Sequence, residues 1–146
     1  MNRMNKNYIK NEIDTLIEHL WRKGYLTVSR RYGTYLPEPK PVGIYEVDVI
    51  AKYKNSYAIG IVVRNSDFDN IIKLREKIIY LASRQTRFTH KPVNLFIGVT
   101  PINYFKAKQI ISEIPDNLKK NIFIVQLFNK NQKNPPDSTK YTPLFV

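Results

Sequence analysis

Residues 44–63, IYEVDVIAKYKNSYAIGIVV, decide the fold that the sequence predicts. The stretch holds two segments rich in β-branched and aromatic side chains, at 44–53 and 56–63, which is the composition of β-strands. Polar residues 54–56 make a tight turn between them, so we expect an antiparallel hairpin. The second segment is apolar on both faces, which is typical of a central strand covered on both sides.

The chain before this hairpin predicts a helix, a strand and a loop. Apolar side chains recur at helical spacing within residues 7–23, and Gly24 follows as a stop signal. The apolar stripe consists of Ile9, Ile13, Leu16, Ile17 and Leu20. Residues 25–29 (YLTVS) are typical of a strand. Residues 36–42 (LPEPKPV) predict a loop, because prolines are excluded from the ladder of a sheet.

Strands and helices alternate after the hairpin. Ser66 is expected to cap a helix whose first turn is acidic, because carboxylates suit the positive end of a helix. Residues 93–99 and 122–128 predict strands, and Pro101 opens a further helix between them. The order α-β-β-β-α-β-α-β predicts an α/β fold with a mixed sheet and helices on both faces.

The composition fits one globular domain. Of the 146 residues, 42% are hydrophobic and 12% aromatic, which is enough for a packed core. We expect a single domain over residues 1–128 and an extended or flexible C-terminal tail over residues 129–146. No apolar run reaches the roughly 18 residues of a membrane span, and cysteine is absent, which excludes zinc–thiolate sites. We therefore expect no membrane partner and a cytoplasmic location.

Basic residues outnumber acidic residues twofold. The 24 Lys and Arg residues against 12 Asp and Glu residues give a net charge of +12, which favours polyanion binding. A lysine- and asparagine-rich proteome is the alternative origin of this charge. Aromatic side chains lie close to the basic clusters, as in surfaces that grip phosphate and stack on bases. The predicted nucleic-acid-binding residues are Arg22, Lys23, Arg30, Arg31, Arg64, Arg84, Arg87 and Lys91.

The order of elements and the positions of two acids resemble the PD-(D/E)XK superfamily, which includes restriction endonucleases and archaeal Holliday-junction resolvases. The resemblance covers roughly residues 12–127. Asp48 matches the acid late in the family's second core strand, and Glu12 matches the acid that the first helix often contributes. The resemblance implies a restriction-endonuclease-like fold. By analogy with the resolvases, which are dimers, it also implies a homodimer.

The rest of the family's catalytic set does not match. The positions of its second acid and its lysine, in the triplet (D/E)-x-K, fall at Ile61 and Val63. The second carboxylate fixes a divalent ion and the lysine positions or activates water, so neither apolar side chain replaces its counterpart. Arg64 and Lys73 are candidate replacements for the lysine. The candidates for a displaced second acid are Asp67, Asp69 and Glu76, although the first two are better explained as the acidic start of a helix. Glu46 lies two residues before Asp48, and strand alternation predicts that both carboxylates share one face.

These residues predict a catalytically degenerate nuclease-like domain that binds nucleic acid, DNA rather than RNA, without a cofactor. No metal site is expected. Asp48 would be its centre if one existed, with Glu12 and Glu46 as vestigial or rearranged catalytic residues. The first alternative is an active nuclease that uses Mg²⁺ or Mn²⁺ at a rearranged site, so enzymatic activity stays open with the balance against it. The second alternative is a scaffold or protein-interaction subunit without nucleic-acid affinity.

Overall fold

The computed structural model describes residues 3–128, and the tail predicted at residues 129–146 lies outside this range. Within the range, no helix combines the length and apolarity needed to cross a membrane. The helices are α1 (Arg3–Arg22), α2 (Ile71–Ala82), α3 (Tyr104–Ser112) and α4 (Asp116–Lys119), with 3-10 turns η1 (Asn65–Asp69) and η2 (Pro101–Asn103). The strands are β1 (Leu26–Arg30), β2 (Val49–Tyr53), β3 (Ser56–Val62), β4 (Asn94–Val99) and β5 (Ile122–Gln126).

The five strands form one mixed sheet in the order β1-β2-β3-β4-β5. The pairs β1–β2 and β2–β3 are antiparallel, whereas β3–β4 and β4–β5 are parallel. The predicted hairpin is confirmed, because Tyr53 pairs with Ser56 across a turn in which Lys54 has a positive φ of 54°. The central position of β3 is also confirmed, which explains why both faces of this strand are apolar.

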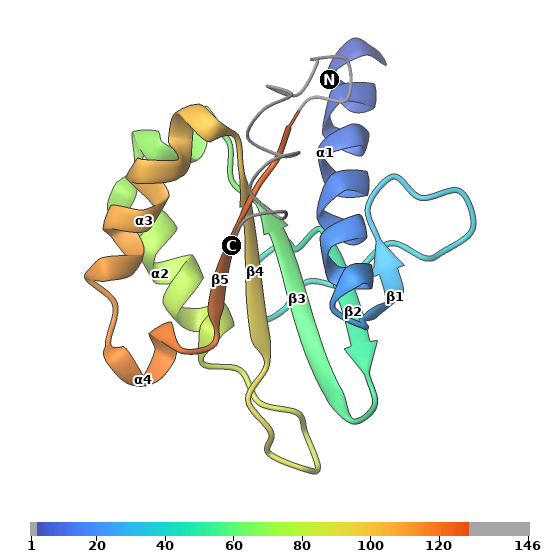
Figure 1. Ribbon diagram of the computed structural model, residues 1–146, viewed down its shortest axis with the longest axis vertical. Coiled ribbons are helices and arrows are strands. Elements are labelled where there is room, and N and C mark those ends of the chain that lie inside the picture. The colour runs from blue at the N-terminus through green and yellow to red at the C-terminus, as the bar shows by residue number, and fades with distance from the viewer. Residues whose placement is uncertain (1–2, 129–146) are drawn as a thin grey trace, which may run out of the picture.

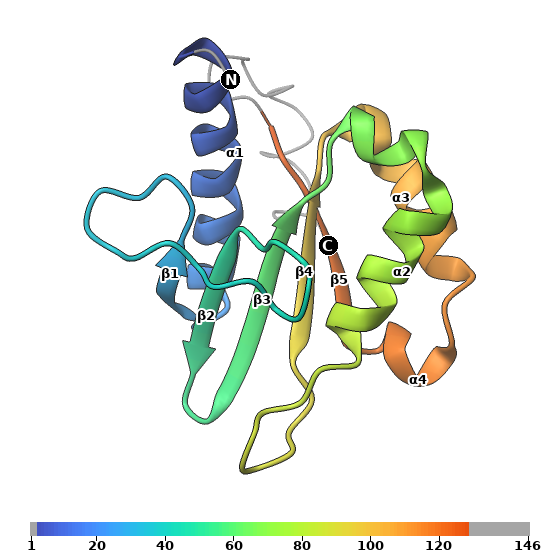
Figure 2. The same ribbon diagram turned by 180° about the vertical axis from the view of Figure 1, so that it is seen from behind.

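Helices cover both faces of the sheet. α1 lies on one face, and α2 and α3 lie on the other (Figures 1 and 2). Leu16 of α1 packs in one core with Val49 of β2, so close to β3 that a Cβ added to Gly60 would lie 3.0 Å from it. Ile78 of α2 packs in a second core with Ile61 of β3. The α/β class and the placement of helices on both faces are therefore confirmed.

The strand predicted at residues 44–53 is shorter than expected, because the backbone changes phase before Val49. Val47 packs in the core under α2 and α3, whereas Val49 packs in the core under α1. A regular strand would place these two residues on the same face. Val42 and Tyr45 instead form an isolated bridge within a loop, and β2 begins at Val49. The prediction of a strand over residues 44–48 was wrong.

The predicted helix starts also differ in detail. Ser66 lies within η1 and caps nothing, whereas Asn70 caps α2 by accepting a hydrogen bond from a backbone N–H of the first turn. The acidic residue Asp67 stabilises η1, because its carboxylate accepts a hydrogen bond of 2.7 Å from the backbone N–H of Arg64. Pro101 opens the 3-10 turn η2, which leads into α3.

Candidate functional site

The predicted site residues divide between two ends of the sheet. At the upper end in Figure 1, β3 and β4 finish beside α1, and the chain enters β2. At the lower end, the β2–β3 turn lies beside the loop that leads from α2 into β4. The predicted catalytic acids belong to the upper end, whereas the basic residues fall into two groups with different partners.

Asp48 lies at the upper end and is only 5% exposed. Its Oδ2 accepts a hydrogen bond of 2.7 Å from the backbone N–H of Val62, at the end of β3. Its Oδ1 lies 3.3 Å from Nη1 of Arg31, just after β1. The backbone of Asp48 also bonds to both neighbours, donating to Gly60 and accepting from Arg31. Asp48 therefore joins the two strands that flank β2, and both carboxylate oxygens are engaged.

Glu12 lies on α1, 8% exposed, and faces Arg64. Its Oε1 is 3.3 Å from Nε of Arg64, close enough for an ion pair but not aligned for a hydrogen bond. Burial raises the pKa of Glu12 above its ordinary value of 4.5, the Arg64 guanidinium opposes this rise, and the charge of Asp48 adds to it. The structure thus brings Glu12 and Asp48 within electrostatic reach of each other.

One sequence expectation about this region was wrong. Glu46 is exposed in the loop before β2, so the predicted shared strand face with buried Asp48 does not exist. Ile61 and Val63 point into the core under α2 and α3, away from α1. At the end of β3 it is Val62 that packs towards α1, and two positions further on stands Arg64, which meets Glu12.

A cavity of about 690 Å³ opens beside this acid–arginine cluster. Asn103 in its wall is buried and donates a hydrogen bond of 2.6 Å to Oδ1 of Asn65. The lining includes Glu12 and Arg64 but not Asp48, so the two acids do not face one hollow. The residues that line it are Tyr8, Asn11, Glu12, Arg64, Asn65, Ser66, Thr100, Pro101, Ile102, Asn103, Leu127 and Phe128.

Four of the eight predicted nucleic-acid-binding residues are paired with carboxylates. Arg31 and Arg64 hold Asp48 and Glu12, respectively. Arg30 lies 2.7 Å from a carboxylate oxygen of Asp14, and Arg22 lies 2.8 Å from one of Glu18. These pairs neutralise the arginines locally, which lowers their attraction for phosphate.

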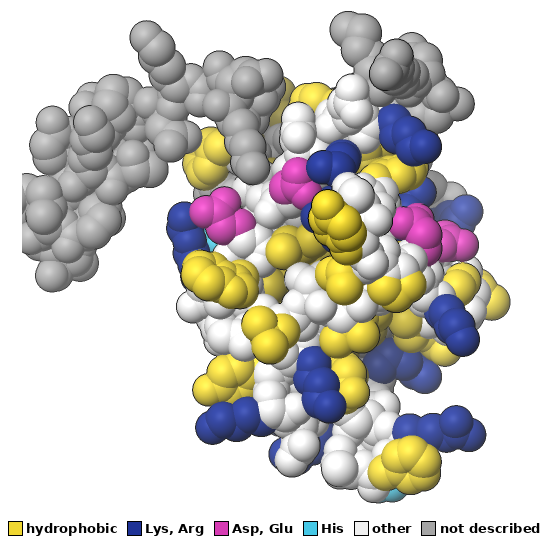
Figure 3. All heavy atoms as spheres, turned by 90° about the vertical axis from the view of Figure 1, so that its right-hand side faces the viewer, with side chains coloured by type: hydrophobic (Ala, Val, Ile, Leu, Met, Phe, Trp, Pro, Cys, Tyr) yellow, Lys and Arg dark blue, Asp and Glu magenta, His cyan; other side chains and the backbone are white. Residues whose placement is uncertain are grey.

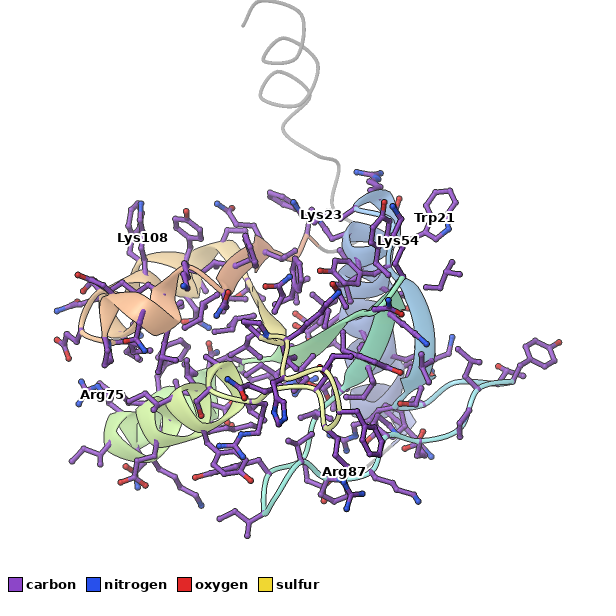
Figure 4. All side chains as sticks on the ribbon, turned by 90° about the horizontal axis from the view of Figure 1, so that it is seen from below. Trp21, Lys23, Lys54, Arg75, Arg87 and Lys108 are labelled. Atoms are coloured by element: carbon purple, nitrogen blue, oxygen red, sulfur yellow. The ribbon has the colours of Figure 1, made fainter. Side chains whose placement is uncertain are left out.

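Lys23 and Trp21 occupy the end of α1. The ammonium of Lys23 lies over the ring of Phe123, 5.9 Å from its centroid. Trp21 is 65% exposed, so it does not pack in the core. Figure 4 labels both residues, seen from below the molecule.

The remaining predicted cations, Arg84, Arg87 and Lys91, lie in the loop of residues 83–93. Two lysines outside this loop, which sequence reasoning missed, lie at the same end of the sheet. Lys52 and Lys54 belong to the β2–β3 hairpin at the same lower end. We call these five residues the basic end: Lys52, Lys54, Arg84, Arg87 and Lys91. Within the described part of the chain, none of them forms an ion pair with a carboxylate.

The two segments that carry the basic end hold no acid of their own. Segments 50–59 and 83–93 contain no Asp or Glu. On the face shown in Figure 3, acidic side chains lie in the upper half, and the charged side chains of the lower half are Lys and Arg. The strand–helix–strand order of the sequence held a signal for this arrangement. Such an order is typical of parallel pairing, which β3 and β4 show, and parallel strands start at the same end of the sheet. The hairpin before β3 and the 83–93 loop before β4 therefore lie together.

A second cavity, of about 570 Å³, lies between the hairpin and the 83–93 loop, and we call it the loop groove. Its lining combines apolar side chains of the sheet and loop with three members of the basic end, and it includes no acid. The residues that line it are Val42, Ile50, Lys52, Asn55, Tyr57, Ala58, Ile59, Arg84, Gln85, Thr86, Arg87, Phe88, Thr89 and Val93.

The acids that the structure describes at the upper end do not form a set of metal ligands. Among residues 3–128, no three His, Asp or Glu side chains gather closely enough to hold a metal ion. The two buried acids at the upper end are each held by an arginine instead. Comparison of the chain with models of protein families, with curated proteins and with solved structures found no match.

Proposed function

We propose that the chain binds nucleic acid, with DNA as the first candidate, through the basic end and without catalysing a reaction. The observation that carries the proposal is the presence, among the described residues, of cations without carboxylate partners around a groove that no acid lines. Arginines at the upper end hold carboxylates, whereas Lys52, Arg84 and Arg87 line a groove without an acid. Phosphate binding by such cations releases counterions, which supplies most of the affinity in sequence-independent binding.

Local charge matters more for this surface than the net charge of +12. At physiological ionic strength the screening length is about 8 Å, so distant exposed cations contribute little to binding at one site. Arg87 and Lys91 are exposed on one loop, and Lys52 of the adjoining hairpin lines the same groove as Arg87. Lys54 lies on the side of Trp21, apart from Arg87 (Figure 4), so it contributes less to this surface. The grouping of Lys52, Arg87 and Lys91 favours a defined binding surface over a diffuse basic coat.

We also propose a distant relationship to the PD-(D/E)XK superfamily. The order α1-β1-β2-β3-α2-β4 supports it, as does the position of Glu12 on α1. Asp48 departs from the family pattern, because it directly precedes β2 instead of standing late in that strand. In this alignment the family's triplet corresponds to Val62-Val63-Arg64, one residue later than the sequence pattern alone placed it. Arg64 then stands at the lysine position, and Val62 replaces the second acid.

The same contacts argue against catalysis by this site. One carboxylate oxygen of Asp48 accepts a hydrogen bond from Val62 and the other pairs with Arg31. Glu12 faces Arg64. A magnesium ion requires free carboxylate oxygens, so both arginine pairs would have to open before the two acids could share an ion. An active nuclease is the rival proposal, and the burial of two carboxylates, Glu12 and Asp48, favours it.

The test is a binding assay with a matched control. We would measure fluorescence anisotropy of a labelled oligonucleotide at about 50 mM salt, where phosphate contacts dominate. The variant Arg87→Gln/Lys91→Gln should bind roughly tenfold more weakly or worse, because two phosphate contacts are lost. The control Lys106→Gln/Lys108→Gln removes the same charge from α3, which Figure 4 places well apart from Arg87.

The control should bind like the unmodified protein. Equal weakening by both variants would mean that net charge alone attracts the oligonucleotide, and the proposal for the basic end would fail. No binding by the unmodified chain, to single-stranded, duplex or junction DNA, would contradict the function itself.

A further inference from the structure

We infer that the loop groove binds unpaired nucleotides, with a base against its aromatic and apolar surface and the adjoining phosphates on its cationic rim. This inference rests on the proposed nucleic-acid binding and adds the class of substrate, single-stranded rather than duplex. Two observations support it: the groove is lined by apolar, aromatic and cationic side chains, and hydrogen bonds fix the backbone of the loop that forms one wall.

The lining is apolar at the sheet and cationic at the edges. Ile50 and Ile59 contribute from neighbouring antiparallel strands, and Val93 is buried just before β4. Arg84 and Arg87 contribute positive charge from the loop. A ligand that matches must carry flat apolar faces and negative charge a short distance apart. Unpaired nucleotides have both, whereas a duplex hides the faces of its bases within the stack.

Phe88 is one of the aromatic residues of the lining. Its side chain is 87% exposed in the wall of the groove, next to Arg87 in sequence. An aromatic ring beside an arginine is the arrangement on which single-stranded bases stack, and stacking tolerates any base because every base has a π-face. Tyr57 lines the opposite wall, on β3, with the ammonium of Lys52 5.4 Å from its ring centroid.

Hydrogen bonds within the 83–93 loop fix the backbone on both sides of Phe88. The backbone N–H of Thr86 donates to Lys91, and that of His90 donates to Thr86, both at 2.9 Å. His90 takes a positive φ of 54°, which lets the chain turn back. Val93 then donates to the carbonyl of Arg84 at 3.1 Å. Because the turn is already ordered, binding a base in the groove costs little additional loop entropy.

Arg84 is similarly fixed before any ligand arrives. Its guanidinium lies 3.8 Å from the ring centroid of Tyr80. Nε donates to the carbonyl of Tyr80 at 2.9 Å, and Nη2 donates to Oγ of Ser83 at 3.1 Å. A guanidinium has five N–H donors, so several remain for phosphate oxygens. The groove volume of about 570 Å³ lies within the usual range of ligand pockets, roughly 300–1,000 Å³.

The experiment separates base stacking from phosphate attraction. We would titrate the full chain into a labelled single-stranded oligonucleotide and into a duplex of the same sequence, in DNA and in RNA. Single strands should bind more tightly than duplex. Phe88→Ala should weaken single-strand binding roughly 5- to 150-fold, the range for loss of one stacked base, and leave duplex binding unchanged. Phe88→Trp should retain the affinity.

Phe105→Ala is the control, because Phe105 is 77% exposed on α3 outside the groove, and it should change nothing. Tighter binding of duplex, or an equal effect of Phe88→Ala on both probes, would overturn the inference. If the Arg87→Gln/Lys91→Gln variant binds more weakly than the unmodified chain in that case, the proposed nucleic-acid binding stands and only the inference about single strands fails. Failure of the unmodified chain to bind any probe would overturn both.

Discussion

Oδ2 of Asp48 accepts a hydrogen bond of 2.7 Å from the backbone N–H of Val62. Through this bond a buried carboxylate, placed just before β2, fixes the end of the central strand β3. The side chain that the sequence offered as the centre of a catalytic site is therefore part of the packing between strands. The same placement makes Asp48 important for stability whether or not the upper end of the sheet has any chemical role.

Replacement of Asp48 should destabilise the fold. Asp48→Ala leaves the N–H of Val62 and the guanidinium of Arg31 without their partner, which should lower the free energy of unfolding by about 3 kcal/mol. Asp48→Asn, which keeps an acceptor for Val62, should cost less. Urea denaturation measures both. The exposed neighbour Glu46 is the control, and Glu46→Ala should stay within about 0.5 kcal/mol. Equal effects at both positions would contradict this role.

Metal-dependent cleavage should be absent. Incubation of single-stranded, duplex and junction DNA with the chain and Mg²⁺ or Mn²⁺ should yield no product, because arginines hold Asp48 and Glu12. Gel electrophoresis of labelled substrates is the measurement. Cleavage that disappears in a folded Asp48→Asn variant would instead establish the rival proposal, an active nuclease at the upper end.

Glu12 should make stability depend on pH. Burial raises its pKa in the folded state above 4.5, so the folded chain binds this proton more tightly than the unfolded chain does. The stabilising contribution is complete below about pH 4.5 and is lost as pH rises through the folded pKa. Relative to Glu12→Gln, the unmodified chain should therefore lose stability over that window. Urea denaturation of both proteins across this range tests it, and a constant difference would refute it.

The fold itself can be tested at the end of α1. Gly24 has a φ of 97°, and a Cβ added there would overlap the ring of Tyr53. Gly24→Ala should lower the free energy of unfolding by about 1–3 kcal/mol, from backbone strain and displacement of the ring. Gly33→Ala is the comparison, because Gly33 has no positive φ and an added Cβ would lie 2.9 Å from the Arg30 side chain rather than overlap a ring, so it should cost less. Thermal denaturation would compare them, and the reverse order of costs would count against this packing.

Local sequence patterns predicted the elements that depend on neighbouring residues. The hairpin at Lys54 and the central strand over residues 56–63 follow from composition and apolar periodicity, which are local properties. The phase change between Val47 and Val49 was missed, because it depends on which core each side chain enters. A strand pattern carries no information about such a break in its own backbone.

The candidate site was predicted less well than the fold, because ion pairing is a long-range property. Arg30 and Arg31 look alike in the sequence to Arg84 and Arg87, yet only the first two meet acids, Asp14 and Asp48 respectively. Those partners come from α1 and from the chain entering β2, and no spacing rule links them to the arginines. The absence of acids from residues 83–93, by contrast, was visible in the sequence.

The salt dependence of binding tests the central claim most directly. The slope of log K against log[salt] should be negative for the unmodified chain, and less steep by roughly 1.4–1.8 for Arg87→Gln/Lys91→Gln, at about 0.7–0.9 for each lost phosphate contact. Lys106→Gln/Lys108→Gln should keep the original slope. If all three proteins share one slope, the basic end does not contact phosphate, and the proposed mode of binding is wrong.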